Sequence, residues 1–248
     1  METLGPLELA FAALVLVTAY AVRGTAGFGG QTLAVPLLVL VLPLPTVLST
    51  VAVLTAISSI GHWMRDWGRI SWREIALLLP YSLAGVLAGL YVLHQVDVRT
   101  LTRILGVFII LYAIFVLVTA TRPLRIAGRY LGAARAVFGA LAGAASAAFG
   151  AGSGPLYAIY FNQLRMERDV FRVTITTILA FQAFLRIAGY AQLGFYDLNV
   201  LLLVAAGVPT VIIGARIGNW LAGRLEQHWF DRGIGALLLV SGVALLFK

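Results

Sequence analysis

Long apolar runs alternate with short polar stretches along the whole chain. A helix needs about 20 apolar residues to cross the hydrocarbon core of a bilayer, and several of the runs reach that length. Three runs are too short to cross upright, namely 31–43, 136–149 and 154–163. The pattern predicts an all-α polytopic membrane protein. The apolar runs cover residues 7–26, 31–43, 46–64, 74–94, 101–120, 136–149, 154–163, 170–190, 198–221 and 230–247.

The composition agrees with this prediction and excludes several classes of function. Hydrophobic residues make up 61% of the chain and charged residues 11%, against roughly 25% charged residues in soluble domains. The chain has no cysteine, which excludes disulfides, thiol catalysis and thiolate metal sites. Its net charge of +8 comes mainly from arginines in short loops between apolar runs, as expected of anchors on the cytoplasmic side of a membrane. The expected partner of these arginines is the lipid bilayer and not nucleic acid.

The two halves of the chain share a weak internal repeat. At an offset of 123 residues, the stretch GFGGQTLAVP (27–36) aligns with GAGSGPLYAI (150–159). We interpret the repeat as a duplication, with residues 1–120 as the first transmembrane repeat, 121–135 as a basic cytoplasmic linker and 136–248 as the second transmembrane repeat. At an offset of 129 a second block aligns Pro80 with Pro209, Gly85 with Gly214, Gly89 with Gly218, Arg103 with Arg232 and Gly106 with Gly235.

Equivalent loops of the two halves differ in charge. The loop 65–73 contains arginines, whereas its counterpart 191–197 contains no basic residue. The link 43–46 has none, whereas its counterpart 163–172 is rich in arginine. Because basic residues favour the cytoplasmic side, we expect two inverted-topology repeats of about five hydrophobic segments each. Both termini then fall outside the cytoplasm, and two arginines do not fit this topology, Arg99 and Arg103.

Each half contains a glycine-rich stretch within its apolar sequence, GTAGFGGQTLAVP (24–36) in the first half and GAGSGP (150–155) in the second. Non-helical backbone at membrane depth is tolerated only where it is buried in protein or lines a cavity. Glycine lets a ligand approach the main chain closely, and the helix that follows points its positive end at the same place. We therefore expect a glycine-rich hairpin tip in each half, with both tips binding one anion near the bilayer centre. The alternative is that the glycines only form small-residue surfaces for helix packing.

Three arginines lie within or beside the apolar runs. Arg186 and Arg216 are inside such runs, and Arg23 precedes the first glycine-rich stretch. The run interiors contain no Asp or Glu to pair with them, and a charge at membrane depth usually faces a cavity or a partner. An anionic substrate would supply the missing charge. Snorkelling to an interface is the alternative for Arg23 and Arg216, and Gln182 would share the helix face of Arg186.

Other polar residues within the runs are weaker candidates. Ser58, Ser59 and Asn162 would either bind substrate or bridge helices. His62 and His94 lie near the ends of runs, and we interpret them as interface residues in preference to proton relays.

No motif points to catalysis. The stretch GAGSG is similar to the serine loop of an intramembrane protease, but Ala151 stands where that motif needs glycine, and His228 lies in a loop. A phosphate-binding loop would end in Gly-Lys-Ser/Thr, which is absent from the sequence. We therefore expect neither an enzyme nor a cofactor. Inverted repeats are typical of secondary transporters with a midplane substrate site. A channel-like anion conductor and a non-transporting membrane scaffold or lipid-binding protein are the alternatives, and a homodimer is left open.

The paired glycine stretches resemble those of the TauE/SafE (sulfite exporter, TSUP) family. In that family the tip reads roughly G-x-G-G-G-x-x-x-x-P, and this chain departs from it at Gln31, Ser153 and Ile159. The resemblance implies transport of a sulfur-containing anion, such as sulfite or an organosulfonate, across the inner (cytoplasmic) membrane without ATP hydrolysis. The predicted substrate-binding residues are Gly27, Gly29, Gly30, Gln31, Thr32, Gly150, Gly152, Ser153, Gly154, Gln182 and Arg186, together with Arg23 and Arg216.

Overall fold

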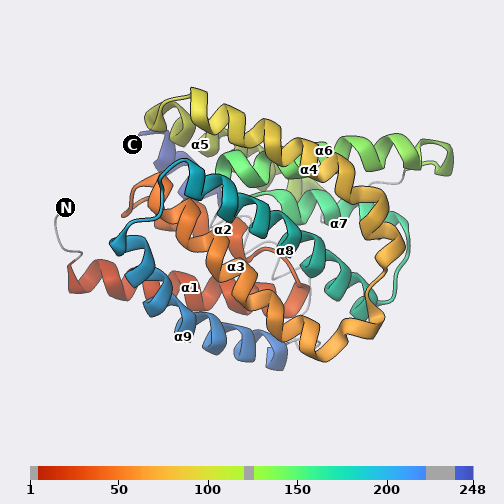
Figure 1. Ribbon diagram of the computed structural model, residues 1–248, viewed down its shortest axis with the longest axis horizontal. Helices are drawn as coiled ribbons and strands as arrows, with labels where there is room; N and C mark the ends of the chain where they lie inside the picture. The colour runs from red at the N-terminus through yellow and green to blue at the C-terminus, as the bar shows by residue number, and fades with distance from the viewer. Residues whose placement is uncertain (1–4, 120–125, 222–237, 248) are drawn as a thin grey trace.

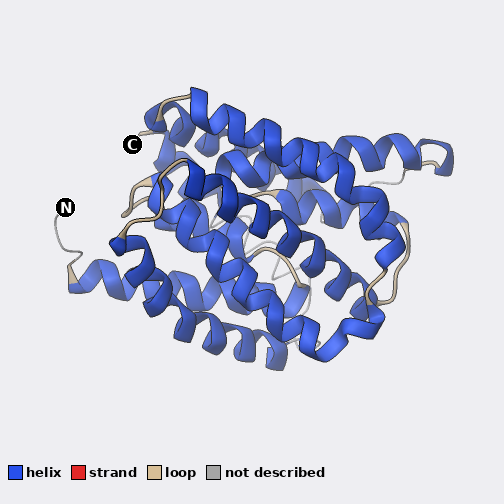
Figure 2. Cartoon of the chain, viewed as in Figure 1, coloured by secondary structure: helices blue, strands red, loops and turns tan. Residues whose placement is uncertain are grey.

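The computed structural model describes residues 5–119, 126–221 and 238–247, and all regular structure in these ranges is helical (Figures 1 and 2). Residues 238–246 form a further helical stretch. The labelled α-helices are α1 (Pro6–Ala26), α2 (Gly30–Leu38), α3 (Leu44–Asp66), α4 (Trp72–Gln95), α5 (Val98–Thr119), α6 (Leu131–Phe149), α7 (Ser153–Gln163), α8 (Arg168–Gln192) and α9 (Leu198–Leu221), with 3₁₀ turns η1 (Trp67–Arg69) and η2 (Gly128–Tyr130).

Six stretches of the described chain are long and apolar enough to cross a membrane, which confirms the prediction of an all-helical polytopic membrane protein. They are Pro6–Ala26, Leu44–Met64, Trp72–Gln95, Gly128–Phe149, Arg168–Gln192 and Leu198–Leu221.

The helix boundaries follow the apolar runs, with one exception. The short runs 31–43 and 154–163 become the short helices α2 and α7, each of which begins directly after a glycine. The short run 136–149 belongs to a longer helix, α6, because the segment from Leu131 to Arg135 continues the helical backbone. Arg135 therefore lies on a helix and not in a linker loop. Parts of the expected linker and of the last apolar run lie outside the described residues.

The helices α4 and α6 pack against each other through small residues. A methyl group added at Gly85 would collide with the carbonyl of Ala140, and one at Gly89 would lie 2.5 Å from the carbonyl oxygen of Ala144. Residue numbers rise together along the contact, so the two helices run parallel. Such close backbone approach is typical of glycine and alanine in membrane helices.

The helices α1 and α9 pack in the same way. A methyl group at Gly214 would lie 2.5 Å from the carbonyl oxygen of Val17, and one at Gly218 would collide with the carbonyl of Ala21. These contacts have the same sequence offsets as the repeat, 129 residues for the glycines and 123 residues for their partners. The contact of α1 with α9 therefore has the same residue pattern as the contact of α6 with α4.

The helices α3 and α8 lie side by side at the centre and run antiparallel (Figure 1). The indole N–H of Trp63 donates to the Thr177 hydroxyl at 3.0 Å, and Asp66 pairs with Arg172 at 3.4 Å. The end of α3 thus meets the beginning of α8. Helix α3 also contacts α9, and α8 contacts α4.

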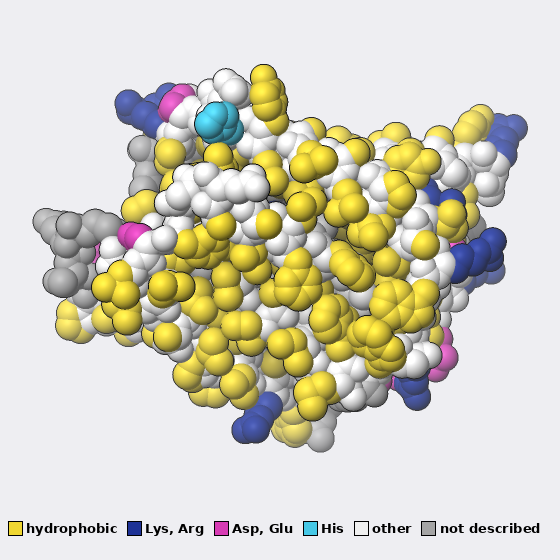
Figure 3. Space-filling model, viewed as in Figure 1, with side chains coloured by type: hydrophobic (Ala, Val, Ile, Leu, Met, Phe, Trp, Pro, Cys, Tyr) yellow, Lys and Arg dark blue, Asp and Glu magenta, His cyan; other side chains and the backbone are white. Residues whose placement is uncertain are grey.

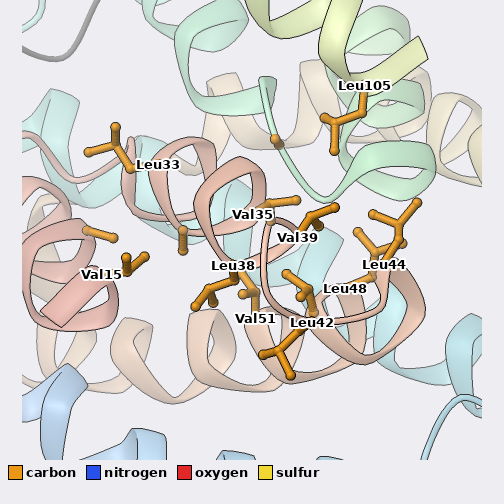
Figure 4. Close-up of a cluster of buried hydrophobic side chains, with 14 of the residues drawn as sticks. Val15, Leu33, Val35, Leu38, Val39, Leu42, Leu44, Leu48, Val51 and Leu105 are labelled. Carbon is orange, nitrogen blue, oxygen red and sulfur yellow. The ribbon is translucent and has the colours of Figure 1, made fainter. Parts of the chain in front are cut away.

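A buried hydrophobic cluster holds the short helix α2 in place (Figure 4). Branched aliphatic side chains of α2 and the following turn interlock with the beginning of α3 and with residues of α1 and α5. This packing supports the glycine loop that precedes α2. The labelled members are Val15, Leu33, Val35, Leu38, Val39, Leu42, Leu44, Leu48, Val51 and Leu105, each at most 7% exposed.

The outer surface has the pattern of a membrane protein. Large hydrophobic side chains such as Leu14, Leu111 and Leu202 are exposed, and one face is mostly hydrophobic between two ends that carry charge (Figure 3). The end that contains η1, η2 and the start of α8 bears most of the exposed arginines, and we call it the arginine-rich end. These are Arg69, Arg73, Arg129, Arg165 and Arg168, whereas Arg99 and Arg103 lie at the opposite end.

Candidate functional site

Two glycine loops interrupt the membrane helices. Gly27 ends α1 and Gly29 precedes α2, both with positive φ, and Gly150 and Gly152 take the same places between α6 and α7. At Gly27, with φ of 83°, a methyl group would lie 2.7 Å from the carbonyl oxygen of Arg172 on α8. Only glycine combines this left-handed backbone with so close a contact. Each loop therefore ends one helix inside the protein and is followed directly by a short helix.

The two loops touch through polar side chains. The Gln31 amide donates to the Ser153 hydroxyl at 2.6 Å, and the backbone N–H of Gly152 donates to the Thr32 hydroxyl at 3.4 Å. Gln31, Thr32 and Ser153 are each at most 2% exposed. The first N–H groups of a helix have no partner within the helix. The beginnings of α2 and α7 thus bring main-chain donors and polar side chains to one buried place.

Arg186 lies at this place and is completely buried. Its guanidinium donates to the side-chain carbonyl of Gln31 at 3.0 Å and to the backbone carbonyl of Ser146 at 3.0 Å. Within the described part of the chain its Nε has no hydrogen-bond partner. Gln31, in the first half of the chain, therefore contacts both Arg186 and Ser153, which belong to the second half. We call Gln31, Thr32, Ser153 and Arg186 the tip cluster.

Arg23 is buried beside the first loop, at 1% exposure. Its Nη2 donates to the Ser59 hydroxyl on α3 at 2.9 Å, and within the described ranges its Nε and Nη1 have no hydrogen-bond partner. Tyr20, three residues before Arg23 on α1, is also fully buried, and its hydroxyl lies 3.4 Å from the Thr55 hydroxyl.

The structure brings eleven of the predicted residues into the buried interior and leaves Arg216 and Gly29 less covered. Arg216 is exposed on α9, apart from the tip cluster, and Gly29 is half-buried. Gly30 packs against Arg23, and Gly154 packs against Phe28. The buried residues are Gly27, Gly30, Gln31, Thr32, Gly150, Gly152, Ser153, Gly154, Gln182, Arg186 and Arg23.

Gln182 belongs to a separate network, although it lies one helical turn before Arg186. Its amide donates to the hydroxyls of Ser82 at 2.9 Å and Tyr157 at 2.7 Å, and Tyr157 donates to Ser82 at 2.7 Å. This triangle joins α4, α7 and α8. Gln182 is thus close to Arg186 in sequence, but its hydrogen bonds join helices and do not involve the tip cluster.

Sequence reasoning missed a line of buried polar residues on α3. Thr55, Ser59, His62 and Asp66 are each at most 8% exposed, and their spacing places them on one helix face. His62 is therefore an interior residue, although its place near a run end suggested an interface. The helical spacing of these four residues could have identified them as one buried face. It was overlooked because each residue alone resembles an ordinary helix-bridging or end-of-helix residue.

Arg172 was also missed as an interior residue, since the arginine-rich stretch 163–172 was expected to be a loop. Its guanidinium, 6% exposed, lies 3.4 Å from Asp66 and 3.4 Å from the carbonyl oxygen of Gly24. The Thr176 hydroxyl, one turn further along α8, donates to the carbonyl of Gly27 at 2.9 Å. Residues of α8 thus bind carbonyl groups in the last turn of α1 and in the first glycine loop.

The charge balance at the site is positive. The ion pairs formed by the described residues join Arg172 with Asp66, Arg135 with Glu74 and Arg69 with Asp169, and none includes Arg23 or Arg186. A buried charge without a counter-charge is costly. Binding of an anion would therefore stabilise the site, because the anion would compensate the positive charge. It would accept hydrogen bonds from the guanidinium groups and from main-chain amides.

Comparison with known proteins identifies the class. The family model described as Sulfite exporter TauE/SafE matches residues 11–245. A relative from Comamonas testosteroni, described as probable inner membrane transporter protein TsaS, is 28% identical over 191 residues, which cover 76% of this chain and 77% of the relative. No solved structure matches the chain significantly.

The apolar helices and these similarities define a multi-pass inner membrane transporter, a class that does not perform catalysis. The chain belongs to the TauE/SafE sulfite exporter family. The resemblance inferred from the glycine-rich stretches is thereby confirmed.

Proposed function

We propose that the protein is a secondary transporter that moves a small, sulfur-containing anion, such as sulfite or an organosulfonate, by alternating access. The observation that carries the proposal is Arg186, a fully buried arginine without an acidic partner in the described chain, held by Gln31 between two glycine loops. The family description and the name of the relative favour a sulfur-containing anion.

The anion would bind between the beginnings of α2 and α7. Both helices point their positive ends at the tip cluster, where main-chain N–H groups attract negative charge. Gln31, Thr32 and Ser153 would add side-chain hydrogen bonds, and Arg186 would neutralise the charge. Gln31 and Ser153 now bond to each other, so substrate entry would exchange their mutual contact for contacts with the anion.

The proposal includes two inverted repeats. In Figure 1, α1 and α3 begin at the left end of the molecule, whereas α6 and α8 begin at the right end. The glycine contacts of α1 with α9 and of α6 with α4 have the offsets of the sequence repeat. With residues 1–120 and 136–248 as the repeats, the arginine-rich end would face the cytoplasm.

Alternating access would be a rocking of two bundles along the contact between α3 and α8. One bundle consists of α1, α3 and α9, and the other of α4, α6 and α8. Aromatic side chains cover the second glycine loop and the start of α7: Phe28 packs on Gly154 and lies edge-on to Phe171 at 6.3 Å, and Phe108 packs on Gly152. Opening either cover would expose the tip cluster to one side.

The test is flux through purified protein in liposomes. Saturable uptake of labelled sulfite or methanesulfonate, accelerated by the same anion on the other side of the membrane, is expected of a transporter. A channel would give flux without this acceleration. Complete absence of anion flux, with protein correctly inserted, would contradict the proposal and favour a scaffold or lipid-binding role.

A further inference from the structure

A polar line leads from the middle of α3 towards the arginine-rich end. It consists of Thr55, Ser59, His62 and Asp66, all buried. Polar residues on one interior face of a membrane helix usually mark a substrate or ion pathway. Because helix packing through small or branched apolar side chains would hold α3 equally well, this line requires a further reason.

The partners of the polar line come from α1 and α8. The hydroxyls of Tyr20 and Thr55 lie 3.4 Å apart, Arg23 donates to Ser59 at 2.9 Å, and Arg172 pairs with Asp66 at 3.4 Å. Ser59 also donates its hydroxyl hydrogen to the carbonyl of Thr55 at 2.9 Å. Ser59 thus positions Arg23 and has no hydrogen left to offer to a ligand.

His62 has a defined tautomer. Its Nδ1 lies 3.2 Å from the backbone carbonyl oxygen of Ser58, and a carbonyl can only accept, so Nδ1 carries a hydrogen. Its Nε2 is buried and has no partner among the described residues. In the neutral imidazole this nitrogen is an acceptor that lacks a donor.

The charged groups around His62 come from three sides. These groups are Arg23 on α1, Arg172 on α8 and Asp66 on its own helix. On α9 the charged residue Arg216 is exposed and lies apart from this interior. The carboxylate of Asp66 is engaged by Arg172, so Arg23 is the cation beside His62 that has no carboxylate partner among the described residues.

Arg23 and His62 therefore offer complementary hydrogen-bonding groups at adjacent turns of one buried face. Residues three apart on a helix, such as Ser59 and His62, are neighbours. Arg23, held at Ser59, offers Nε–H and Nη1–H as donors that lack partners among the described residues, and His62 offers an acceptor. A ligand that satisfies both must carry anionic oxygens and a hydrogen of its own.

We propose that Arg23 and His62 form a second anion-binding station, between the tip cluster and the arginine-rich end, which takes a monoanionic oxyanion that carries a proton, such as hydrogen sulfite. The proposal rests on the proposed function and adds where the anion pauses and in which protonation state. When an anion without such a hydrogen binds, His62 Nε2 must take up a proton from solvent. The resulting N–H then donates a hydrogen bond to the anion.

The experiment measures proton uptake on binding, by titration calorimetry of the full chain in slightly acidic buffers of different ionisation enthalpy. The probes are sulfite, which is then mainly hydrogen sulfite, and methanesulfonate, which is permanently deprotonated. We expect the unmodified protein to take up a proton with methanesulfonate and none with sulfite. His62→Gln should take up none with either probe, because an amide does not titrate, whereas His94→Gln, at an exposed histidine, should behave as the unmodified protein.

A second pair of variants tests the guanidinium. Arg23→Gln should weaken binding of both probes by about tenfold to a hundredfold, as expected for lost charge-assisted hydrogen bonds, and Arg23→Lys should restore part of the affinity. Arg216→Gln is the matched control at an exposed arginine and should leave affinity unchanged.

The outcomes separate this inference from the proposed function. If His62→Gln takes up the same proton as the unmodified protein, or if Arg23→Gln matches Arg216→Gln, the second station is wrong while saturable anion flux still supports transport. If the unmodified, inserted protein neither binds nor moves any of the anions, the proposed function itself fails. Size-exclusion profiles establish folding of each variant. If Arg23→Gln does not fold, the affinity of Arg23→Lys decides the role of Arg23, and an affinity equal to that of the unmodified protein would contradict the station.

Discussion

The polar residues of α3 and α8 use equivalent positions in opposite ways. Ser59 on α3 and Gln182 on α8 are related by the offset of 123 residues. On the α3 side, Ser59 holds a buried arginine with two nitrogens that lack partners in the described chain. On the α8 side, Gln182 joins Ser82 and Tyr157 in a closed triangle of neutral hydrogen bonds, with its Oε1 alone unpaired among the described atoms of the triangle.

The difference separates two tasks that polar groups perform inside a membrane protein. A network of neutral hydrogen bonds fixes helices relative to one another. A buried cation without a counter-ion lowers stability and is retained where a ligand supplies the missing charge. We therefore expect substitutions in the triangle to change stability, and substitutions near Arg23 and Arg186 to change anion binding.

Loss of Arg186 should have the largest effect. Arg186→Ala is expected to reduce transport about a hundredfold or more, because charge-assisted hydrogen bonds contribute about 1.5–3 kcal/mol each and about 1.4 kcal/mol is a tenfold change. Arg186→Lys should retain a measurable fraction. Anion flux in liposomes at equal amounts of inserted protein is the measurement, and unchanged flux in Arg186→Ala would refute the assigned role.

Substitution of the first glycine loop should rank next. Gly27→Ala combines a positive φ with the contact to Arg172, so its cost should exceed the roughly 1–2 kcal/mol of left-handed backbone alone. Gly29→Ala is the matched control, since it shares the positive φ but meets only a side-chain methyl of Val22 at 3.0 Å. Thermal unfolding in detergent compares the two; equal losses would show that the contact with α8 is unimportant.

Substitution in the triangle of Ser82, Tyr157 and Gln182 should give a smaller effect, and this effect should be on stability. Tyr157→Phe removes one hydroxyl, which donates to Ser82 and accepts from Gln182, and should lower the unfolding free energy by about 1–3 kcal/mol. Anion affinity, measured by calorimetry, should stay within about twofold, because the triangle makes no charged contact. A large loss of anion affinity in Tyr157→Phe with unchanged stability would contradict the separate tasks assigned to the polar residues of α3 and α8.

The smallest effect concerns the exposed helix caps that precede α5 and α9. The backbone N–H of Thr100 donates to Asp97, and that of Val200 donates to Asp197, which lowers the pKa of each carboxyl below its ordinary value of 3.8. The caps therefore stabilise the fold fully at pH values above the ordinary pKa. This contribution disappears as the pH falls through the lowered pKa of the folded state. The melting temperature should fall slightly in acid, and less so in Asp97→Asn and Asp197→Asn; identical acid profiles would argue against this contribution.

The sequence by itself determined the helical membrane class, the family and the places where the helices break. A bilayer core offers the main chain no hydrogen-bond partners, so an apolar run of about 20 residues is expected to cross it as a helix, which pairs these groups internally. Glycine-rich stretches can be located without knowing their neighbours. Arg186, Gln31 and Ser153 were identifiable because polar residues stand out against apolar sequence. The aligned glycines that suggest the repeat stand out because glycine contacts between helices tolerate no larger residue.

Only the tertiary structure decided which polar groups meet. Helical periodicity places Gln182 and Arg186 on one face, but α4 and α7 draw the Gln182 amide into the triangle, while Gln31 draws the Arg186 guanidinium to the glycine loops. Likewise α1 and α9 pack so that Arg23 is buried and Arg216 is exposed. The reason is physical: a sequence limits which residues share a helix face, whereas the partner of that face depends on segments far away along the chain.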